Sequence, residues 1–367
     1  MAIPGSVKEK LDDLPPSSKF IYKTLERNGQ LTQKELTEET MLSARTTRYG
    51  IKQLQEAGLL ESTPALHDAR QTCYGLATGE NGRTDYATDA LVEVEWVADR
   101  LDEFESDDPS MRLVEADAAD SYEDGHIPGA VGVDWVASLT GENGRGTPDE
   151  GTFEELLGRN GITADSTVVL YGDESNWFAA YAYWLFKYYG HEDVHLLNGG
   201  RELWVERGYP TTTDVPEFTE REYGARGPLE HLRAYRDDVE RALVEDTTLL
   251  DVRSSEEFAG DQREPPGDTR TPTTMVGGHI PGSVHVPWSK TVDDDGRFQD
   301  RDVLADLYES EGLTEDQELI VYCHVGERSA VTWFVLSELL GYDDVANYDG
   351  SWSEWGNLVD APVETEE

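Results

Sequence analysis

The chain contains 367 residues, with 30 basic and 76 acidic side chains and a formal net charge of −46 at pH 7. This length predicts two or three domains. The sequence has no apolar run of about 18 residues, which excludes a transmembrane helix, and no signal-peptide pattern at its start, so we expect a soluble, cytoplasmic protein without a membrane partner. The only cysteines, Cys73 and Cys323, exclude a disulfide framework and a cysteine-rich zinc site.

The negative charge is unevenly distributed along the chain. Residues 1–77 contain 10 Lys+Arg and 10 Asp+Glu, whereas the other 290 residues contain 20 basic and 66 acidic side chains and carry the whole −46. Such a surface repels itself until concentrated salt shortens the Debye length to about 3 Å. We interpret the charge as adaptation to salt and not as mimicry of nucleic acid. Nine Trp, 17 Tyr and clear apolar periodicity argue against a disordered acidic protein.

The first 77 residues have the pattern of three helices followed by a β-hairpin. Apolar periodicity predicts helices over 18–28, 33–39 and 44–57. Gly29 and Gly58 are the expected stops of the first and third helix, and Ser43 is the expected N-cap of the third. Short strands around 59–60 and 72–74 flank a polar turn, and Cys73 is expected to be a packed strand residue. This arrangement resembles a winged helix-turn-helix domain.

The resemblance implies DNA contact by the third helix and by the hairpin loop. The candidate contacts are Arg45, Thr46 and Arg48 early in that helix, with His67 and Arg70 in the hairpin. The alternative is a module for protein contacts, because zero net charge gives little attraction to phosphates in ordinary salt. In concentrated salt this attraction is weak for any protein, and residues 1–77 are the one part of the chain that a polyanion could approach. We therefore favour DNA contact.

After a polar stretch at 78–88, which we expect to be a linker, the sequence repeats itself. "DGHIPGAVGVDW" (124–135) returns as "GGHIPGSVHVPW" (277–288), and residues 167–204 return more loosely as 318–355. A repeat of about 150 residues indicates duplicated domains and not a solenoid. Each copy alternates short apolar strands with helical segments, which predicts an α/β fold with a parallel sheet and helices on both faces. We place the copies at 89–213 and 229–365.

Two sets of residues in the copies are expected to be structural. His126 and His279 occupy the same place in both copies, which indicates a role in fixing the turn. An aromatic cluster in the first copy is expected to form core and interdomain packing; its members are Trp177, Phe178, Tyr181, Tyr183 and Trp184.

In the second copy a cysteine lies between a strand and a helix. The apolar run 319–322 predicts a buried strand, and the stripe from Ser329 onward predicts a helix, so Cys323 lies at the carboxyl end of a strand, where α/β sheets bind ligands. A thiol is nucleophilic only as a thiolate, and backbone N–H groups before a helix N-terminus stabilise negative charge. We expect the loop to favour the thiolate, with Gly326 relaxing the backbone, Arg328 adding positive charge and Ser329 capping the helix.

Together, the "GHIPG" turn in both copies and the Cys-x4-Arg-Ser loop in the second resemble tandem rhodanese domains. The likeness covers about residues 89–365 and is strongest to the acidic two-domain thiosulfate sulfurtransferases of salt-loving archaea. It implies that Cys323 attacks the sulfane sulfur of thiosulfate, sulfite leaves, and a thiol or cyanide-like acceptor removes sulfur from the Cys323 persulfide. Gly172 stands where the second copy has Cys323, which implies a silent first copy. No cofactor is implied, and the sequence contains no metal cluster or nucleotide fingerprint.

The resemblance also implies a substrate site made by the loop and a nearby arginine. Its members are His324, Val325, Gly326, Glu327, Arg328, Ser329 and Arg253. For Arg253, a structural ion pair with Asp251 or Glu257 is an equal alternative. His324 stands where such sulfurtransferases carry arginine, which predicts weaker attraction of thiosulfate; a solvent-facing loop histidine is the alternative.

Three other functions remain open on the sequence. Cysteine phosphatases also use a Cys-loop-Arg motif, but they have five residues between Cys and Arg, whereas this loop has four. Mercaptopyruvate as substrate is disfavoured because the loop does not resemble "CGSG". A transcriptional regulator that senses sulfur through persulfidation of Cys323 is the main competitor. The oligomeric state does not follow from the sequence.

Overall fold

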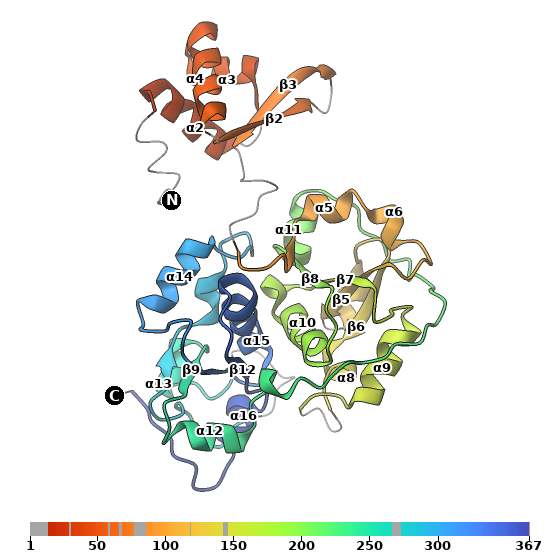
Figure 1. The fold of residues 1–367 in the computed structure, drawn as a ribbon, viewed down its shortest axis with the longest axis vertical. Coiled ribbons are helices and arrows are strands. Elements are labelled where there is room, and N and C mark those ends of the chain that lie inside the picture. The colour runs from red at the N-terminus through yellow and green to blue at the C-terminus, as the bar shows by residue number, and fades with distance from the viewer. Residues whose placement is uncertain are drawn as a thin grey trace. The chain divides into compact units, whose positions relative to one another are not determined.

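The computed structural model describes residues 14–28, 31–57, 59–65, 68–76, 86–117, 119–141, 146–265 and 273–366 (Figure 1). The chain divides into two compact units, Met1–Asp85 (unit 1) and Tyr86–Glu367 (unit 2), each of which is described by itself. The elements of unit 1 are α2 (Pro16–Asn28), β1 (Leu31–Thr32), α3 (Gln33–Thr40), α4 (Ala44–Glu56), β2 (Leu60–Ala65) and β3 (Asp68–Leu76).

Unit 1 has the three helices and the hairpin expected of a winged helix. The Ser43 side chain accepts a hydrogen bond from the N–H of Thr46 (3.2 Å), so the expected N-cap of α4 is confirmed. β2 and β3 pair antiparallel, and β1 adds to β3 as a third strand. Apolar residues of the three helices and of β2 form one core; they include Ile21, Leu25, Leu36, Ile51, Leu54 and Leu60.

The first copy in unit 2 forms a five-stranded parallel sheet with the strand order β4-β8-β7-β5-β6. Its elements are β4 (Leu91–Val92), α5 (Val94–Ala98), α6 (Leu101–Phe104), β5 (Met111–Asp117), α7 (Ala119–Asp124), β6 (Ala130–Asp134), α8 (Trp135–Ser138), α9 (Glu150–Arg159), β7 (Thr167–Tyr171), the 3-10 turn η1 (Glu174–Asn176), α10 (Trp177–Tyr188), β8 (Val194–Leu197) and α11 (Gly200–Glu206).

The second copy forms a four-stranded parallel sheet with the order β10-β9-β11-β12. Its elements are the 3-10 turn η2 (Glu230–Leu232), α12 (Arg236–Ala242), β9 (Thr248–Asp251), α13 (Ser255–Ala259), β10 (Val284–His285), the 3-10 turn η3 (Trp288–Thr291), α14 (Arg301–Glu309), β11 (Leu319–Tyr322), α15 (Glu327–Phe334), the π-helical turn η4 (Val335–Leu340), β12 (Val345–Asn347) and α16 (Ser351–Trp355). The α/β architecture predicted from the repeat is confirmed in both copies.

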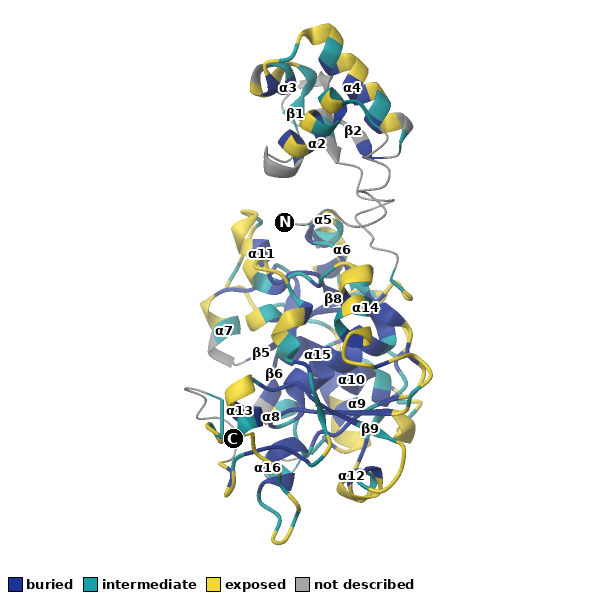
Figure 2. Ribbon diagram, turned by 90° about the vertical axis from the view of Figure 1, so that its left-hand side faces the viewer, coloured by how far each residue is buried: buried dark blue, intermediate teal, exposed yellow. Residues whose placement is uncertain are grey.

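Helices cover both faces of each sheet, and the two copies share one core. On the outer faces, α5, α6 and α11 pack on the first sheet, and α12 and α16 pack on the second. On the facing sides, α9 and α10 of the first copy and α14 and α15 of the second belong to a single cluster of buried residues. Figure 2 shows α10 and α15 in the dark blue of buried residues. The two copies therefore stabilise one another through a continuous apolar layer.

Helix α10 carries the aromatic cluster at the centre of this layer. Phe178, Tyr181, Tyr183 and Trp184 are at most 2% exposed, as expected for a helix that is apolar all round. The Tyr183 ring meets Phe334 of α15 edge-on, with ring centroids 4.9 Å apart. The expected role of the cluster in core and interdomain packing is confirmed.

The duplication is visible in matching hydrogen bonds. The hydroxyl of Tyr171 accepts from the N–H of Ile127 (3.0 Å), and the hydroxyl of Tyr322 accepts from the N–H of Ile280 (3.1 Å). The equivalent histidines each stack on an aromatic ring, on Tyr122 in the first copy and Phe258 in the second, and each forms an isolated antiparallel bridge with a later segment. This environment supports a turn-fixing role for His126 and His279.

The segment at the start of unit 2 runs along the second copy before it enters the first. Tyr86, Ala87 and Thr88, which fall in the expected linker, hydrogen-bond to Gln299, Leu339 and Glu338, respectively.

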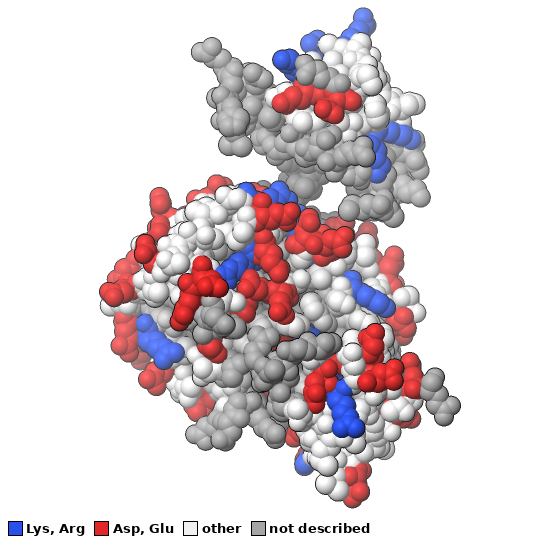
Figure 3. Space-filling view, turned by 180° about the vertical axis from the view of Figure 1, so that it is seen from behind, with Lys and Arg blue, Asp and Glu red and all other residues white. Residues whose placement is uncertain are grey.

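Figure 3 shows acidic side chains spread over the visible face of unit 2. In the part of the chain that the structure describes, no helix has the length and apolar character needed to span a bilayer.

Candidate active site

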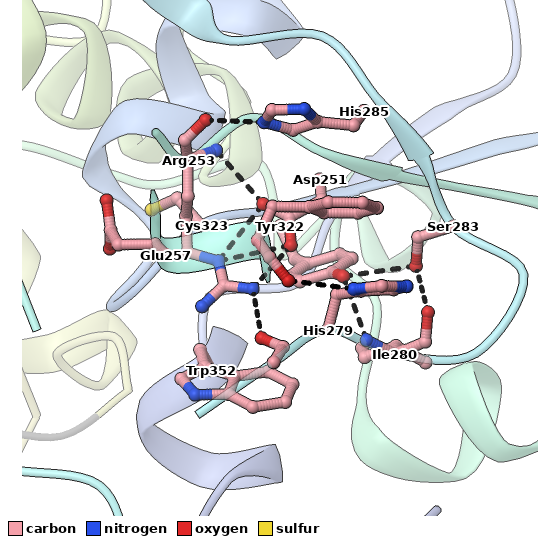
Figure 4. A network of polar contacts seen from close by, with 12 residues as sticks. Asp251, Arg253, Glu257, His279, Ile280, Ser283, His285, Tyr322, Cys323 and Trp352 are labelled. Atoms are coloured by element: carbon pink, nitrogen blue, oxygen red, sulfur yellow. Dashed lines mark hydrogen bonds and ion pairs between the residues drawn. The ribbon is translucent and has the colours of Figure 1, made fainter. Parts of the chain in front are cut away.

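The candidate nucleophile lies at the carboxyl end of a central strand of the second sheet. Strand β11 ends at Tyr322, Cys323 follows directly, and α15 begins at Glu327 after a loop of four residues that starts with the cysteine. Cys323 is fully buried, and Figure 4 shows its sulfur beside the network that joins β9, β11 and the 277–288 turn. The predicted strand–Cys–loop–helix arrangement is present.

Gly326 allows this loop to close tightly before the helix. Its φ is +101°, which L side chains rarely adopt, and a Cβ at this position would lie 2.8 Å from the Cα of Asp349. Both the conformation and the close approach require glycine. Gly326 is also the N-cap residue of α15. The expectation that Ser329 caps the helix is therefore wrong, because Ser329 lies within the first turn.

Three groups of the loop and helix contact the sulfur of Cys323. The N–H of Gly326 donates to Sγ at 3.1 Å, and Oγ of Ser329 lies 3.6 Å from Sγ, but the single proton of this hydroxyl has a shorter acceptor in Asn347 (2.7 Å). The third contact is a carboxylate, since Sγ lies 3.5 Å from Oε2 of Glu327. The loop therefore offers the sulfur a backbone donor for a negative charge and a carboxylate acceptor for a proton.

Residues at the end of β12 and at the start of α16 hold the loop in place. The N–H of Cys323 donates to Oγ of Ser351 (3.0 Å). Asn347 accepts from the Ser329 hydroxyl (2.7 Å) and donates to the carbonyl of Gly326 (3.1 Å). Asn347 and Ser351 were not predicted from the sequence; their position at the carboxyl end of a strand beside β11 is the signal that could have identified them.

Arg328 is committed to a buried ion pair. Its Nη1 and Nη2 donate to the two carboxylate oxygens of Glu257 in α13 at 2.8 and 3.0 Å, and its Nε lies 3.6 Å from Oε1 of Glu327. Burial would raise the pKa of Glu257, but the hydrogen bonds and charge of Arg328 lower this pKa to about 2. The Arg328 charge near Cys323 is thus shared between two carboxylates. The sequence presented Glu257 as a candidate partner of Arg253, and its pairing with Arg328 was missed.

The thiolate of Cys323 is disfavoured in this structure. Burial, followed by the Glu327 carboxylate, raises the pKa of the Cys323 thiol, and Arg328 and Ser329 only partly oppose this. The expectation that the loop favours the thiolate is therefore wrong for the unmodified cysteine. The physical reason is that the sulfur is removed from water while the nearby arginine is already paired.

Arg253 forms an internal ion pair with Asp251. Its guanidinium donates to both oxygens of Asp251 (Nε at 3.0 and 3.1 Å, Nη2 at 2.5 Å) and to the carbonyl of Gly278 (2.7 Å). The Arg253 and Asp251 side chains are both fully buried, and the Arg253 guanidinium lies over the Trp352 ring at 4.5 Å (Figure 4). This geometry favours the structural interpretation of Arg253 over contact with substrate.

The remaining loop residues differ in exposure. His324 is fully buried, and its carbonyl accepts from the N–H of Ser353 (2.8 Å). The alternative of a solvent-facing histidine is therefore wrong. Val325 is partly exposed and lies against the apolar layer between the copies.

The first copy has no counterpart of the nucleophile. Gly172 follows β7 as Cys323 follows β11, and the next loop passes through three residues with positive φ, Glu174–Asn176. Asn176 fills the space behind the loop, accepting from the N–H of Gly172 (2.9 Å) and donating to the carbonyl of Leu197 (2.7 Å). A Cβ on Gly172 would lie 2.8 Å from the carbonyl oxygen of Ala116.

The candidate DNA contacts of unit 1 lie mainly on one helix. Arg45 and Arg48 are exposed on α4, together with Tyr49 and Lys52, whereas Thr46 is half-buried beside the N-cap. Arg70 lies in β3, but its side chain is outside the described residues, as is the whole of His67. Cys73 pairs with Thr32 and Thr63 in the sheet; its side chain is also outside the description.

The sequence matches two families of known proteins. The family described as "Rhodanese-like domain" matches residues 93–207 and again 235–358. The family described as "MarR family" matches residues 23–71, within unit 1.

Curated relatives match the tandem part of the chain. A protein of Haloferax volcanii named "Putative thiosulfate sulfurtransferase" is 56% identical over 282 residues, which cover 77% of this chain and 98% of that protein. The "Sulfur carrier protein TtuD" of Thermus thermophilus is 45% identical and covers 75% of this chain and 96% of its own length. Since almost all of each relative is matched, about a quarter of this chain has no counterpart in them.

Solved structures share the tandem fold. SseA from Escherichia coli, described under the rhodanese fold and mechanism of 3-mercaptopyruvate sulfotransferases, superposes with a TM-score of 0.62 at 27% identity, covering 73% of this chain and 100% of that chain. An anaerobic ergothioneine biosynthesis enzyme from Chlorobium limicola, in complex with trimethyl histidine, has a TM-score of 0.66 at 29% identity, covering 76% of this chain and 70% of its own.

Proposed function

Since this chain belongs to the rhodanese family, with two family domains in tandem, we propose that it is a cytoplasmic thiosulfate sulfurtransferase in which Cys323 carries the transferred sulfur. The observation that carries the proposal is the position of Cys323, buried at the end of β11 with the N–H of Gly326 3.1 Å from its sulfur. The name of the Haloferax volcanii relative supports thiosulfate as the donor.

The proposed reaction has two half-reactions. The sulfur of Cys323 attacks the sulfane sulfur of thiosulfate, the S–S bond of thiosulfate breaks, and sulfite leaves with the bonding electrons. A thiol or cyanide-like acceptor then attacks the outer sulfur of the persulfide and releases Cys323. In this proposal the loop residues His324 to Ser329 form the substrate site, and the N–H of Gly326, which donates to Sγ of Cys323, stabilises negative charge on the sulfur.

Other donors are weaker candidates. The Escherichia coli structure is described under 3-mercaptopyruvate sulfotransferases. The loop of this chain, however, does not resemble the "CGSG" loop that would favour mercaptopyruvate as the donor. A phosphatase requires room for a tetrahedral phosphate, whereas only four residues separate Cys323 from Arg328, two of them (Gly326 and Glu327) contact the sulfur, and Arg328 is already paired with Glu257.

The test compares the two cysteines of the chain. Cys323→Ser should abolish sulfur transfer from thiosulfate to cyanide in molar salt, because no other described group can carry the persulfide, whereas Cys73→Ser should retain nearly full turnover. Intact-protein mass should rise by one sulfur when thiosulfate is added to the wild type and to Cys73→Ser. Turnover above a few per cent in Cys323→Ser, or hydrolysis of aryl phosphates without a persulfide, would contradict the proposal.

A second function is favoured by unit 1. The match to the MarR family and the exposed Arg45, Arg48 and Lys52 on one face of α4 support DNA binding by this helix, in the manner of a recognition helix. Such binding would make the chain a regulator whose sulfurtransferase part senses sulfur. It is compatible with turnover, because the two activities use different units.

A further inference from the structure

A carboxylate lies against the nucleophile at the first turn of α15. Oε2 of Glu327 is 3.5 Å from Sγ of Cys323, a distance at which a thiol donates a hydrogen bond to a carboxylate. Cys323 is fully buried and Glu327 is 4% exposed, so water has little access to this pair. The contact is unexpected in a site for a dianion, because the carboxylate repels both thiosulfate and a persulfide anion.

The cations of the described residues around Glu327 are already paired with other carboxylates. Among the residues that the structure describes, the cation next to Glu327 is Arg328, whose two Nη atoms bind Glu257 and leave Nε, at 3.6 Å, for Glu327. Arg253, which follows β9, is paired with Asp251, and Arg233, which follows η2, is paired with Asp349. Other described groups around the loop include neutral hydrogen-bonding side chains and the imidazole of the loop: Ser329, Asn347, Ser351 and His324.

We propose that Glu327 accepts the thiol proton of Cys323 when sulfur is loaded and holds that proton while the cysteine carries the persulfide. This inference rests on the proposed function. In the first half-reaction Sγ bonds to the sulfane sulfur, the S–S bond of thiosulfate breaks, the electron pair leaves on sulfite, and the thiol proton moves to Oε2 of Glu327. In the second, the acceptor removes the outer sulfur, Cys323 is released as a thiolate, and Glu327 returns the proton to it.

The exchange keeps the charge of the buried site constant. The resting pair is a neutral thiol and a carboxylate; the loaded pair is a persulfide anion and a neutral carboxylic acid. Without the transfer, two negative charges would lie side by side away from water, which is a costly arrangement. The raised pKa of Cys323 agrees with a resting thiol whose proton must be removed at the moment of attack.

The experiment follows the proton by infrared difference spectroscopy. Wild-type protein is loaded with thiosulfate at a pH at which sulfite carries no proton, and persulfide formation is verified by intact mass. We expect a new C=O band of a protonated carboxylic acid that disappears when cyanide unloads the enzyme. The band should be absent in Glu327→Gln and present in Glu311→Gln, an exposed control.

Kinetics separate proton transfer from a simple charge effect. Glu327→Gln removes the carboxylate that raises the pKa of Cys323, so alkylation of Cys323 by iodoacetamide should become faster at neutral pH. If Glu327 is the proton acceptor, kcat/KM for thiosulfate should nevertheless fall by about 100-fold, with partial recovery in Glu327→Asp. Faster alkylation together with equal or faster sulfur transfer would overturn the proposal.

These experiments distinguish failure of the Glu327 role from failure of the proposed sulfurtransferase function. If thiosulfate adds no sulfur to the wild type, the thiosulfate sulfurtransferase assignment fails, and this inference fails with it. If the persulfide forms completely and no carboxylic acid band appears, only the role of Glu327 is overturned. The wild-type spectrum decides this even if Glu327→Gln does not fold.

Discussion

The pair of Glu257 and Arg328 joins α13 to the catalytic loop from inside the second copy. Both side chains are at most 5% exposed, and the pKa of Glu257 falls from 4.5 to about 2 despite its burial. A carboxyl whose pKa is lower in the folded state stabilises the fold above its unfolded pKa. This contribution is lost as the pH falls from about 4.5 towards 2.

Glu257→Gln should therefore destabilise unit 2 at neutral pH by about 3–5 kcal/mol, because it leaves the buried guanidinium of Arg328 without its main partner. Glu256→Gln, on the exposed neighbour, should change the free energy of unfolding little. The measurement is denaturant unfolding in molar salt at a series of pH values. The gap between wild type and Glu257→Gln should narrow below pH 4.5; a constant gap would contradict the assigned pairing.

His324 gives a second test at the scale of one residue. The charge of Arg328 is largely neutralised by Glu257 and Glu327. His324→Arg should add a positive charge that attracts the thiosulfate dianion, and KM for thiosulfate should fall about fivefold, equivalent to roughly 1 kcal/mol. His324→Gln, which adds no charge, should leave KM nearly unchanged. An unchanged or higher KM in His324→Arg would show that this position does not act on the substrate.

The strand, loop and helix around Cys323 could largely be predicted from the sequence, whereas the polar contacts of the loop could not. The apolar stripe of Val331, Phe334, Val335, Leu339 and Leu340 is buried as predicted. Periodicity did not indicate the π-helical turn over Val335–Leu340, because apolar residues there remain buried in either helix type. Glu257 lies 71 residues from Arg328 along the chain, and such a pairing depends on the tertiary fold, which spacing does not specify.

The tight loop can be tested through its glycine. Gly326→Ala should destabilise the second copy by about 1–3 kcal/mol and reduce persulfide formation, because it combines a positive φ with a contact to Asp349. Gly312→Ala is the matched control: its φ is +81° and nothing lies within 4 Å of its Cβ position. Gly312→Ala should lower the free energy of unfolding only through the strain of a positive φ, and sulfur transfer should remain intact. Equal sulfur transfer in both variants, measured beside thermal unfolding, would show that the close packing of the loop is not needed.

At the scale of the whole molecule, the acidic surface and the shared core have separate roles. Unit 2 contains most of the charge, which concentrated salt screens, while the layer around α10 and α15 holds the two rhodanese domains together. The repeats, the charge break near residue 78 and the apolar patterns were sufficient to predict this organisation. The sequence does not specify whether the two units communicate.

DNA binding provides the test of that communication. The full chain should bind the DNA upstream of its own gene, and Arg48→Ala should weaken this binding, whereas Lys34→Ala, an exposed change on α3, should weaken it less. If the chain is a sulfur sensor, thiosulfate should alter DNA affinity in the wild type and not in Cys323→Ser. The measurement is fluorescence anisotropy at several salt concentrations. No sequence-specific binding at any salt would leave unit 1 as a protein-contact module.

The loop of the first copy also limits how a second nucleophile could arise by mutation. Two of the four glycine codons become cysteine codons by one nucleotide change, but the surroundings of Gly172 oppose a cysteine there. A Cβ at Gly172 would lie 2.8 Å from the carbonyl oxygen of Ala116 and 3.1 Å from Oδ2 of Asp117, and Asn176 closes the loop from behind. A cysteine at position 172 would therefore require accompanying changes in β5 and in the loop. A single substitution there does not give the first copy a nucleophile in the geometry of Cys323.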